Sequence, residues 1–263
     1  MDKEEILLQK RLIELSRIAY TRGIVTFSDL LNLNELNILH TTPKNLFYSR
    51  YETFGGYDLA ERQMVAFLPD ALYYNGTGDL ADSDETGLGY PLEVLKIRPL
   101  NQRFSEELGH RDYLGAVMNL GIERCKLGDI MINGTDAFLF VCKEMAEYIR
   151  ENLTRIRHTS VQAETALDFP VSYEPKYEEV RGTVASVRLD TVLALVYPLS
   201  RSKITAYIEG ARVFVNGKLI TSNGYRLKER DIISVRKMGR IVYDGVLSET
   251  KKGRYMVQVR KYL

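Results

Sequence analysis

Residues 188–240 have the sequence RLDTVLALVYPLSRSKITAYIEGARVFVNGKLITSNGYRLKERDIISVRKMGR, and this stretch decides the fold of the C-terminal third of the chain. Apolar residues recur at helical spacing over 189–196 and again over 204–211, which predicts two amphipathic helices. Ser200 is expected to cap the second helix, because its hydroxyl can accept from a free first-turn N–H. Gly210 is expected to adopt the left-handed conformation that commonly ends a helix.

A small sheet is predicted after the second helix. Asn216-Gly217 is the preferred two-residue hairpin turn, and it separates the short apolar runs 213–215 and 218–220. A further strand is expected at 232–235, after a polar turn. The stretch therefore predicts two short helices that pack on a small, curled hairpin sheet.

The order of short motifs in this stretch resembles the RNA-binding domain named after small-subunit ribosomal protein S-four. The motifs are RLD at 188–190, SRS at 200–202, GARVFVNG at 210–217, LKERD at 227–231 and VRKMGR at 235–240. This chain has Arg230 where the family usually has a glycine before the aspartate. The difference is expected to alter the turn without changing the fold.

The resemblance implies RNA contact by the second helix and the neighbouring sheet edge. Carried over by position, these contacts are Arg201, Ser202, Lys203, Arg212 and Lys218, with Arg188 beside them. Lys and Arg side chains neutralise phosphates and release counterions, and a helix N-terminus offers backbone donors to an anion. The predicted RNA-binding residues are Arg188, Arg201, Ser202, Lys203, Arg212, Lys218, Arg236, Lys237 and Arg240. The alternative is an ordinary solvated surface.

The distribution of charge argues against that alternative. Residues 181–263 hold 17 Lys and Arg against 6 Asp and Glu, a net charge of +11. The whole chain holds 36 basic and 35 acidic residues, so residues 1–180 hold 19 and 29, a net charge of −10. A basic third of this size is typical of a nucleic-acid-binding protein.

Several classes of protein are disfavoured by the rest of the sequence. No run approaches the ~20 apolar residues that span a bilayer, and the start MDKEE lacks a signal-peptide pattern. Cys125 and Cys142 are isolated, so neither a zinc site nor a disulfide framework is indicated. We therefore expect a cytoplasmic protein with free thiols, no membrane insertion, no metal and no cofactor.

Residues 1–75 are predicted to form a mixed helical and β region. Helical spacing of apolar residues predicts one helix that ends near Gly23, and a second one that Thr26 or Ser28 caps. The run at 64–68 is predicted to be a buried strand.

The motif GGYDLAER at 55–62 precedes that strand. Its paired glycines predict a tight turn or a close approach of two backbones. Arg62 could hold a phosphate or pair with an acid inside the fold, and the structural role is favoured.

Residues 76–165 are predicted to form a ferredoxin-like domain that begins with a Gly-rich loop at 75–89. RNA-recognition-motif domains share this element order, but their aromatic signature on the third strand is absent here. Phe138, Phe140 and the sheet could still bind RNA, but a role in core packing is favoured. The predicted elements are strands at 92–97, 126–132, 137–142 and 155–163, and helices at 105–120 and 144–153.

Three longer motifs resemble the YlmH-type bacterial proteins. They are GGYDLAER at 55–62, LGHRDYLGAVMNLGIER at 108–124 and TVASVRLD at 183–190. Such proteins have an N-terminal body, a middle domain similar to an RNA-recognition motif and an S-four-type domain at the end. They are often encoded beside cell-division genes, and the family has been linked to ribosomes and to rescue of stalled large subunits.

The sequence gives little support for catalysis. The best acid–base cluster is formed by Glu106, Glu107, His110, Arg111 and Asp112, and the i, i+4 spacing of Glu106 and His110 also suits a plain surface hydrogen bond. The RLD motif resembles that of pseudouridine synthases, but the threonine-glycine-leucine run of those enzymes does not follow it. A glycine-rich cofactor loop and a P-loop are also absent, so no catalytic residue is predicted.

The combined prediction is an α+β chain with an N-terminal region at 1–75, a ferredoxin-like domain at 76–165, a linker at 166–182 and an S-four-like domain at 183–263. Its predicted function is non-catalytic binding of structured ribosomal or transfer RNA. The large ribosomal subunit is an expected partner, and the acidic N-terminal body could bind a protein. Two alternatives stay open: an RNA-modifying enzyme that docks through the basic domain, and a cell-division adaptor.

Overall fold

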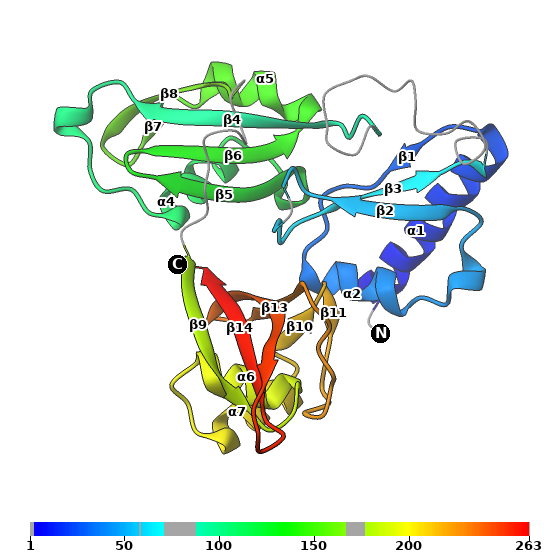
Figure 1. Ribbon diagram of the computed structural model, residues 1–263. Coiled ribbons are helices and arrows are strands. Elements are labelled where there is room, and N and C mark those ends of the chain that lie inside the picture. Colours follow the sequence, from blue (N-terminus) through cyan, green and yellow to red (C-terminus); the bar gives the residue numbers. More distant parts are fainter. Residues whose placement is uncertain (1–2, 58, 71–87, 167–176, 263) are drawn as a thin grey trace. The chain divides into compact units, whose positions relative to one another are not determined.

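The computed structural model describes residues 3–57, 59–70, 88–166 and 177–262. Figure 1 shows an α+β chain with three antiparallel sheets in these residues, which confirms the predicted fold class. The chain divides into two compact units, Met1–Ser172 and Tyr173–Leu263. The predicted boundary between 1–75 and 76–165 falls inside the first unit and stays a prediction.

The first unit begins with two helices and a three-stranded sheet of order β1-β3-β2. Gly23, with φ +66°, follows the first helix as predicted. Leu12, Leu15 and Ala19 pack the first helix against Phe67 of the sheet. The elements are α1 (Lys3–Arg22), β1 (Thr26–Phe27), α2 (Leu33–Thr41), the 3-10 turn η1 (Lys44–Leu46), β2 (Arg50–Phe54) and β3 (Met64–Leu68).

The cap predicted for the second helix is wrong. Thr26 lies in β1, and Ser28 accepts a hydrogen bond from the backbone N–H of Val65 at 2.9 Å. Asn32 caps α2 instead, and the Glu35 carboxylate accepts from the Asn32 backbone N–H at 2.6 Å. This reciprocal pair is a capping box. The Thr26 hydroxyl donates to the Leu15 carbonyl instead, so neither predicted cap faces the start of α2.

A five-stranded sheet of order β5-β6-β4-β8-β7 follows in the same unit. Its element order confirms the predicted βαββαβ pattern, with the last strand split in two. Helices α4 and α5 cover one face, where Ala137, Leu139 and Val141 join the core. Phe138 and Phe140 are buried on the other face, as expected for core packing. The elements are β4 (Leu92–Pro99), η2 (Gln102–Phe104), α4 (His110–Met118), η3 (Arg124–Lys126), β5 (Leu127–Asn133), β6 (Asp136–Cys142), α5 (Lys143–Asn152), β7 (Arg155–Ile156) and β8 (Thr159–Thr165).

Two predicted boundaries in this region are wrong. The helix predicted from residue 105 begins at His110, because the Asp112 carboxylate accepts from the Gly109 N–H at 2.9 Å and caps it there. The strand predicted at 155–163 is a hairpin, with Arg157 at φ +53° in its turn. The Gly-rich loop predicted at 75–89 lies outside the described residues up to residue 87.

The second unit is a six-stranded antiparallel sheet of order β11-β10-β12-β13-β14-β9, with α6 and α7 on one face. Alternate residues of the strands, including Val213, Val235 and Val257, pack against the helices. The elements are β9 (Tyr177–Val184), α6 (Leu189–Val196), α7 (Arg201–Glu209), β10 (Val213–Val215), β11 (Lys218–Leu219), β12 (Asp231–Val235), β13 (Gly239–Glu249) and β14 (Tyr255–Tyr262).

One predicted turn of this unit is confirmed, and one predicted helix end differs. Asn216 and Gly217 have φ of 48° and 75°, which confirms the predicted hairpin turn. Ala211 (φ 55°), and not Gly210 (φ −76°), takes the left-handed conformation after α7. Residues 166–182, predicted to be a linker or an edge strand, form the edge strand β9 from Tyr177 onward, and residues 167–176 lie outside the described part.

Arg230 has φ +67°, at the position where the resembled family usually has glycine. An arginine therefore occupies a conformation that favours glycine, and whether the turn differs from the family's stays a prediction. Among the residues that the structure describes, no helix combines the length and the apolar character needed to cross a bilayer.

Candidate nucleic-acid interface

The first turn of α7 carries three of the predicted RNA-binding residues, and we call Arg201, Ser202 and Lys203 the helix-start group. All three side chains are exposed. The Ser200 hydroxyl accepts from the Lys203 N–H at 3.4 Å and lies 3.1 Å from the Ser202 hydroxyl. Among the ion pairs of the described residues, none involves Arg201 or Lys203. Both cations are thus available to an anion beside the helix N-terminus.

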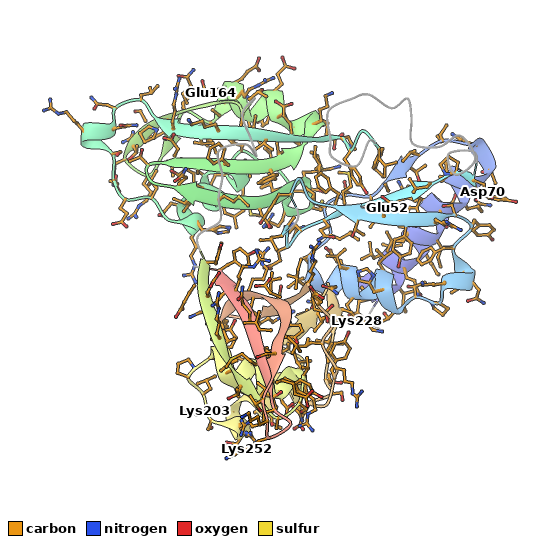
Figure 2. All side chains as sticks on the ribbon, viewed as in Figure 1. Glu52, Asp70, Glu164, Lys203, Lys228 and Lys252 are labelled. Carbon is orange, nitrogen blue, oxygen red and sulfur yellow. The ribbon has the colours of Figure 1, made fainter. Side chains whose placement is uncertain are left out.

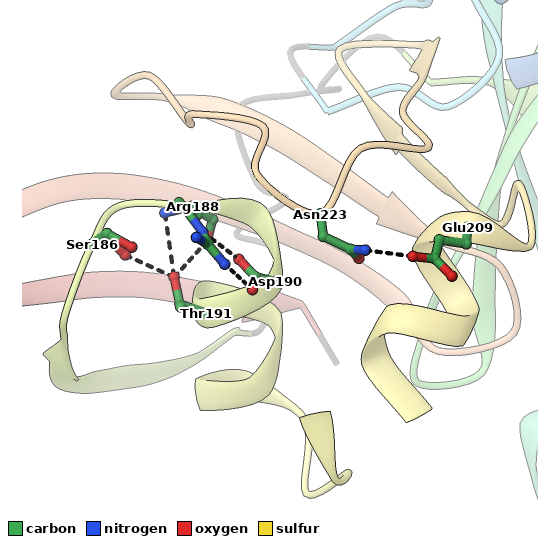
Figure 3. Close-up of polar contacts among 6 residues, drawn as sticks. All are labelled: Ser186, Arg188, Asp190, Thr191, Glu209 and Asn223. Atoms are coloured by element: carbon green, nitrogen blue, oxygen red, sulfur yellow. Dashed lines mark hydrogen bonds and ion pairs between the residues drawn. The ribbon is translucent and has the colours of Figure 1, made fainter. Parts of the chain in front are cut away.

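Arg188 lies at the start of α6, where Asp190 holds it (Figure 3). Its Nε and Nη2 donate to the two carboxylate oxygens at 3.0 and 2.5 Å. Partial burial opposes ionisation of Asp190, but the hydrogen bonds from Arg188 hold the pKa of the carboxyl below its ordinary value. Asp190 therefore acts as a helix-start partner, as its place in RLD suggested, and it offsets part of the Arg188 charge.

Of the residues beside which Arg188 was expected, Arg212 follows the end of α7, and the helix-start group lies at the other end of that helix. The loop after β11 ties the start of α6 to the end of α7, because Leu189 N–H donates to the Tyr225 carbonyl and Asn223 donates to Glu209 at 2.8 Å (Figure 3). A nine-residue helix is about 12 Å long, so Arg201 begins α7 about that far from Glu209. Helices α6 and α7 are therefore antiparallel, and the order of the motifs along the sequence did not predict this arrangement.

Four cations, which we call the helix-end group, lie on the side where α7 ends. Its members are Arg188, Arg212, Arg226 and Arg236. Arg226 forms a β-bridge with Arg188, and Arg236 N–H donates to the Arg212 carbonyl at 2.9 Å. Arg226 was not among the predicted site residues, because only the bridge shows that it lies beside Arg188.

Aromatic rings hold the guanidinium groups of two of these arginines in place. The guanidinium of Arg212 lies 5.3 Å from the Tyr207 ring centre, and that of Arg236 lies 5.5 Å from the ring centre of Phe214. Such cation–π contacts fix a flat guanidinium at the surface, where it can meet a phosphate or a base.

The remaining predicted residues belong to the sheet. Lys237 lies in the β12–β13 turn with φ +68°, and Arg240 is paired with Ser234 across that hairpin. Lys218 is exposed and starts the edge strand β11. In Figure 2, Lys203 and Lys252 lie at one end of this unit and Lys228 at the other, so cations extend over its whole length.

Two carboxylates of the acid–base cluster of the first unit, Glu106 and Asp112, bind groups of the β7–β8 hairpin or the start of α4. Glu106 accepts from the His158 N–H at 3.2 Å, and Arg157 pairs with Glu106 at 3.7 Å and with Asp112 at 3.6 Å. Burial and the nearby Arg124 lower the pKa of His110. Glu106 and His110 therefore do not share a helix face, since α4 begins only at His110.

Arg62 has a structural role. Its side chain is buried, and its Nη2 donates to the Leu30 carbonyl at 2.6 Å. The partner is thus a carbonyl, where the sequence suggested an acid. Among the described residues, no group of His, Cys, Asp and Glu could hold a metal ion.

Comparison with known families places two domains on this framework. Residues 88–168 match the family described as "Putative RNA-binding domain in YlmH", and residues 187–233 match the family described as "S4 domain". The chain is therefore of the class that carries RNA-binding domains. A YlmH-type domain followed by a C-terminal S4 domain confirms the resemblance to the YlmH-type proteins.

One similar protein is "Ribosome-associated protein quality control protein P2" of Bacillus subtilis (strain 168). It is 29% identical over 261 residues, which cover 97% of this chain and 94% of that protein. A solved structure, "Cell division protein ylmH from Streptococcus pneumoniae", is 20% identical with a TM-score of 0.48, and covers 64% of this chain and 94% of its own. This structural similarity is too low to carry an argument.

Proposed function

We propose that this protein is a non-catalytic, cytoplasmic RNA-binding protein that acts in ribosome quality control. It docks on the large ribosomal subunit by binding structured RNA, which is either ribosomal RNA or a transfer RNA bound there. The helix-start group would hold phosphates of the RNA. The contact would continue along the RNA backbone through the helix-end group, Lys218, Lys237 and Arg240. The name of the Bacillus relative supports the ribosome as the place of action.

One observation carries the proposal: the helix-start group places an exposed Arg and an exposed Lys, with no ion-pair partner among described residues, in the first turn of α7. Two exposed cations in a segment without net charge would contribute little to the binding of a polyanion. Here they belong to a segment whose net charge is +11, so the local potential adds to the direct contacts.

A docking function without chemistry is supported by the first unit. Glu106 and Asp112 of its acid–base cluster are held by hydrogen bonds and ion pairs of the fold, and Asp190 is bound to Arg188. The proposed function therefore requires binding and orientation only.

The test is binding of purified large ribosomal subunits at several salt concentrations, with wild type and the double variant Arg201→Glu/Lys203→Glu. The variant should bind at least about tenfold more weakly. The slope of log affinity against log salt is negative, and it should become less steep by about 2, because each phosphate contact contributes about one released counterion.

The matched control is Lys10→Glu/Arg11→Glu on α1, which makes the same change of charge at two exposed positions of the first unit. It should leave affinity and slope close to wild type. Unchanged binding by the Arg201/Lys203 variant, or an equal loss in the control, would show that the helix-start group is not the docking site.

A further inference from the structure

The first unit brings two sequence segments together at the end of α1. Residues 17–24 form the last turns of the helix and its exit, and residues 44–50 follow α2. The Tyr48 N–H donates to the Ser16 hydroxyl at 3.2 Å, and the rings of Tyr20 and Tyr48 lie 6.4 Å apart at an angle of 42°. The two tyrosines thus form one surface although 28 positions separate them in sequence.

Large apolar side chains gather on these segments and stay exposed. Tyr20 and Tyr48 are each 53% exposed, Ile24 is 48% exposed and Leu46 is 43% exposed. Scattered single exposed side chains need no explanation, but four on two touching segments indicate an interaction surface.

The charges of this surface distinguish it from the rest of the unit. Residues 14–24 and 43–52 contain Arg17, Arg22, Lys44 and Arg50 against Glu14 and Glu52, a net charge of +2, while residues 1–180 have a net charge of −10. Arg17 is held by Glu14 at 2.8 Å. Arg22 and Lys44 are exposed, and neither takes part in an ion pair among the residues described.

Exposed tyrosines between cations suit single-stranded nucleic acid. Unpaired bases stack on aromatic rings regardless of sequence, and neighbouring Arg or Lys side chains hold the phosphates that join them. A protein partner would also cover apolar area, but two half-exposed rings in a locally basic region of an acidic unit complement a polyanion with flat bases.

We propose that Tyr20, Tyr48, Arg22 and Lys44, with Ile24 and Leu46, form a second RNA-binding surface that takes unpaired nucleotides. We call it the tyrosine surface. Bases stack on the two rings, and Arg22 and Lys44 contact the backbone. The inference rests on the proposed function in that the partner is RNA, and it lies in a different unit from the helix-start group.

The test uses the full chain and two probes: an RNA hairpin with a single-stranded tail of about ten uridines, which exceeds the smallest site sizes of stacking proteins, and the same hairpin without a tail. The variant Tyr20→Ala/Tyr48→Ala should lose about tenfold or more in affinity for the tailed hairpin. Its affinity for the blunt hairpin should not change.

Two matched variants separate stacking from general apolar contact. Tyr20→Phe/Tyr48→Phe keeps the flat rings and should bind the tailed hairpin as wild type does. Tyr20→Leu/Tyr48→Leu keeps apolar area without a ring and should be as weak as the alanine variant. If the leucine variant binds as wild type, the surface does not stack bases, and a protein partner becomes the better interpretation.

Failure of this inference can be told from failure of the proposed function. The Arg201→Glu/Lys203→Glu variant should lose affinity for both probes. If it binds both as wild type does, the helix-start group is not the docking site, while the tail-specific loss in the alanine variant still supports the tyrosine surface. Equal binding of the tailed hairpin by wild type and the alanine variant overturns the tyrosine surface. Ultraviolet crosslinking of the wild type to the tailed hairpin tests the same point without a substitution. Mass spectrometry of the crosslinked peptides shows whether those that contain Tyr20 and Tyr48 contact the RNA.

Discussion

The ring of Tyr57 lies against the ring of Phe140, with centres 5.1 Å apart. Tyr57 belongs to the GGYDLAER motif and Phe140 to β6, on the sheet face opposite the helices. In RNA-recognition-motif domains, aromatic residues of the open sheet face stack bases. Here the motif covers Phe140, so RNA contact by the YlmH-type domain would have to use another part of its surface.

Asp129 is predicted to hold this motif on the sheet. Its Oδ2 accepts from the Tyr57 hydroxyl and from the Glu61 N–H, both at 2.7 Å, and its Oδ1 accepts from the Arg62 N–H at 3.3 Å. Asp129→Ala leaves three donors without this acceptor and should lower the free energy of unfolding by about 2 kcal/mol, measured in urea. Glu147→Ala, on the exposed side of α5, should change it by less than about 0.5 kcal/mol. Equal effects would show that Asp129 does not hold the motif.

Gly56 is predicted to tolerate no side chain. Its φ is +96°, and a Cβ there would lie 2.3 Å from a ring carbon of Phe140. Gly56→Ala should therefore cost about 3 kcal/mol or more, since strain and overpacking add. Gly121→Ala is the control, because Gly121 has φ +84° with open space around it and should show only the strain of about 1 kcal/mol. Thermal unfolding of both variants measures the difference.

The end of α7 offers a pair of substitutions with opposite signs. Ala211 has φ +55°, a conformation that glycine adopts more readily, so Ala211→Gly should stabilise the protein by about 0.5–1 kcal/mol. Gly210→Ala should destabilise it, because the added Cβ would lie 2.6 Å from the Ala206 carbonyl oxygen. Chemical denaturation of the two variants tests this, and a destabilised Ala211→Gly would contradict it.

The Cys142 thiol predicts a dependence of stability on alkaline pH. Burial raises its pKa from 9.0 to about 12. The folded protein therefore keeps a proton that the unfolded chain releases near pH 9, so this contribution is complete below about pH 9 and is lost as pH rises toward 12. The difference in unfolding free energy between wild type and Cys142→Ala should fall by about 1.4 kcal/mol per pH unit in that range. A constant difference would show that folding does not raise the pKa of the thiol.

Local signals in the sequence were sufficient for most elements of the second unit. The Ser200 cap, the Asn216-Gly217 turn and the apolar spacing of α6 each depend on contacts between near neighbours, and the structure confirms all three. The same holds for the βαββαβ order of the first unit. Errors fall where two local options compete, as at Thr26 and Asn32, and packing elsewhere selects one.

The sequence by itself determined the class of the fold, the basic character of the C-terminal unit and the identity of its exposed cations, because composition and short-range periodicity suffice for these. Only the tertiary structure decided which cations are neighbours. It separates Arg188 from Arg201, pairs Arg188 with Arg226, and brings Tyr20 to Tyr48. These relationships depend on how helices and strands cross, and that is fixed by burial of distant apolar residues that no short stretch of sequence contains.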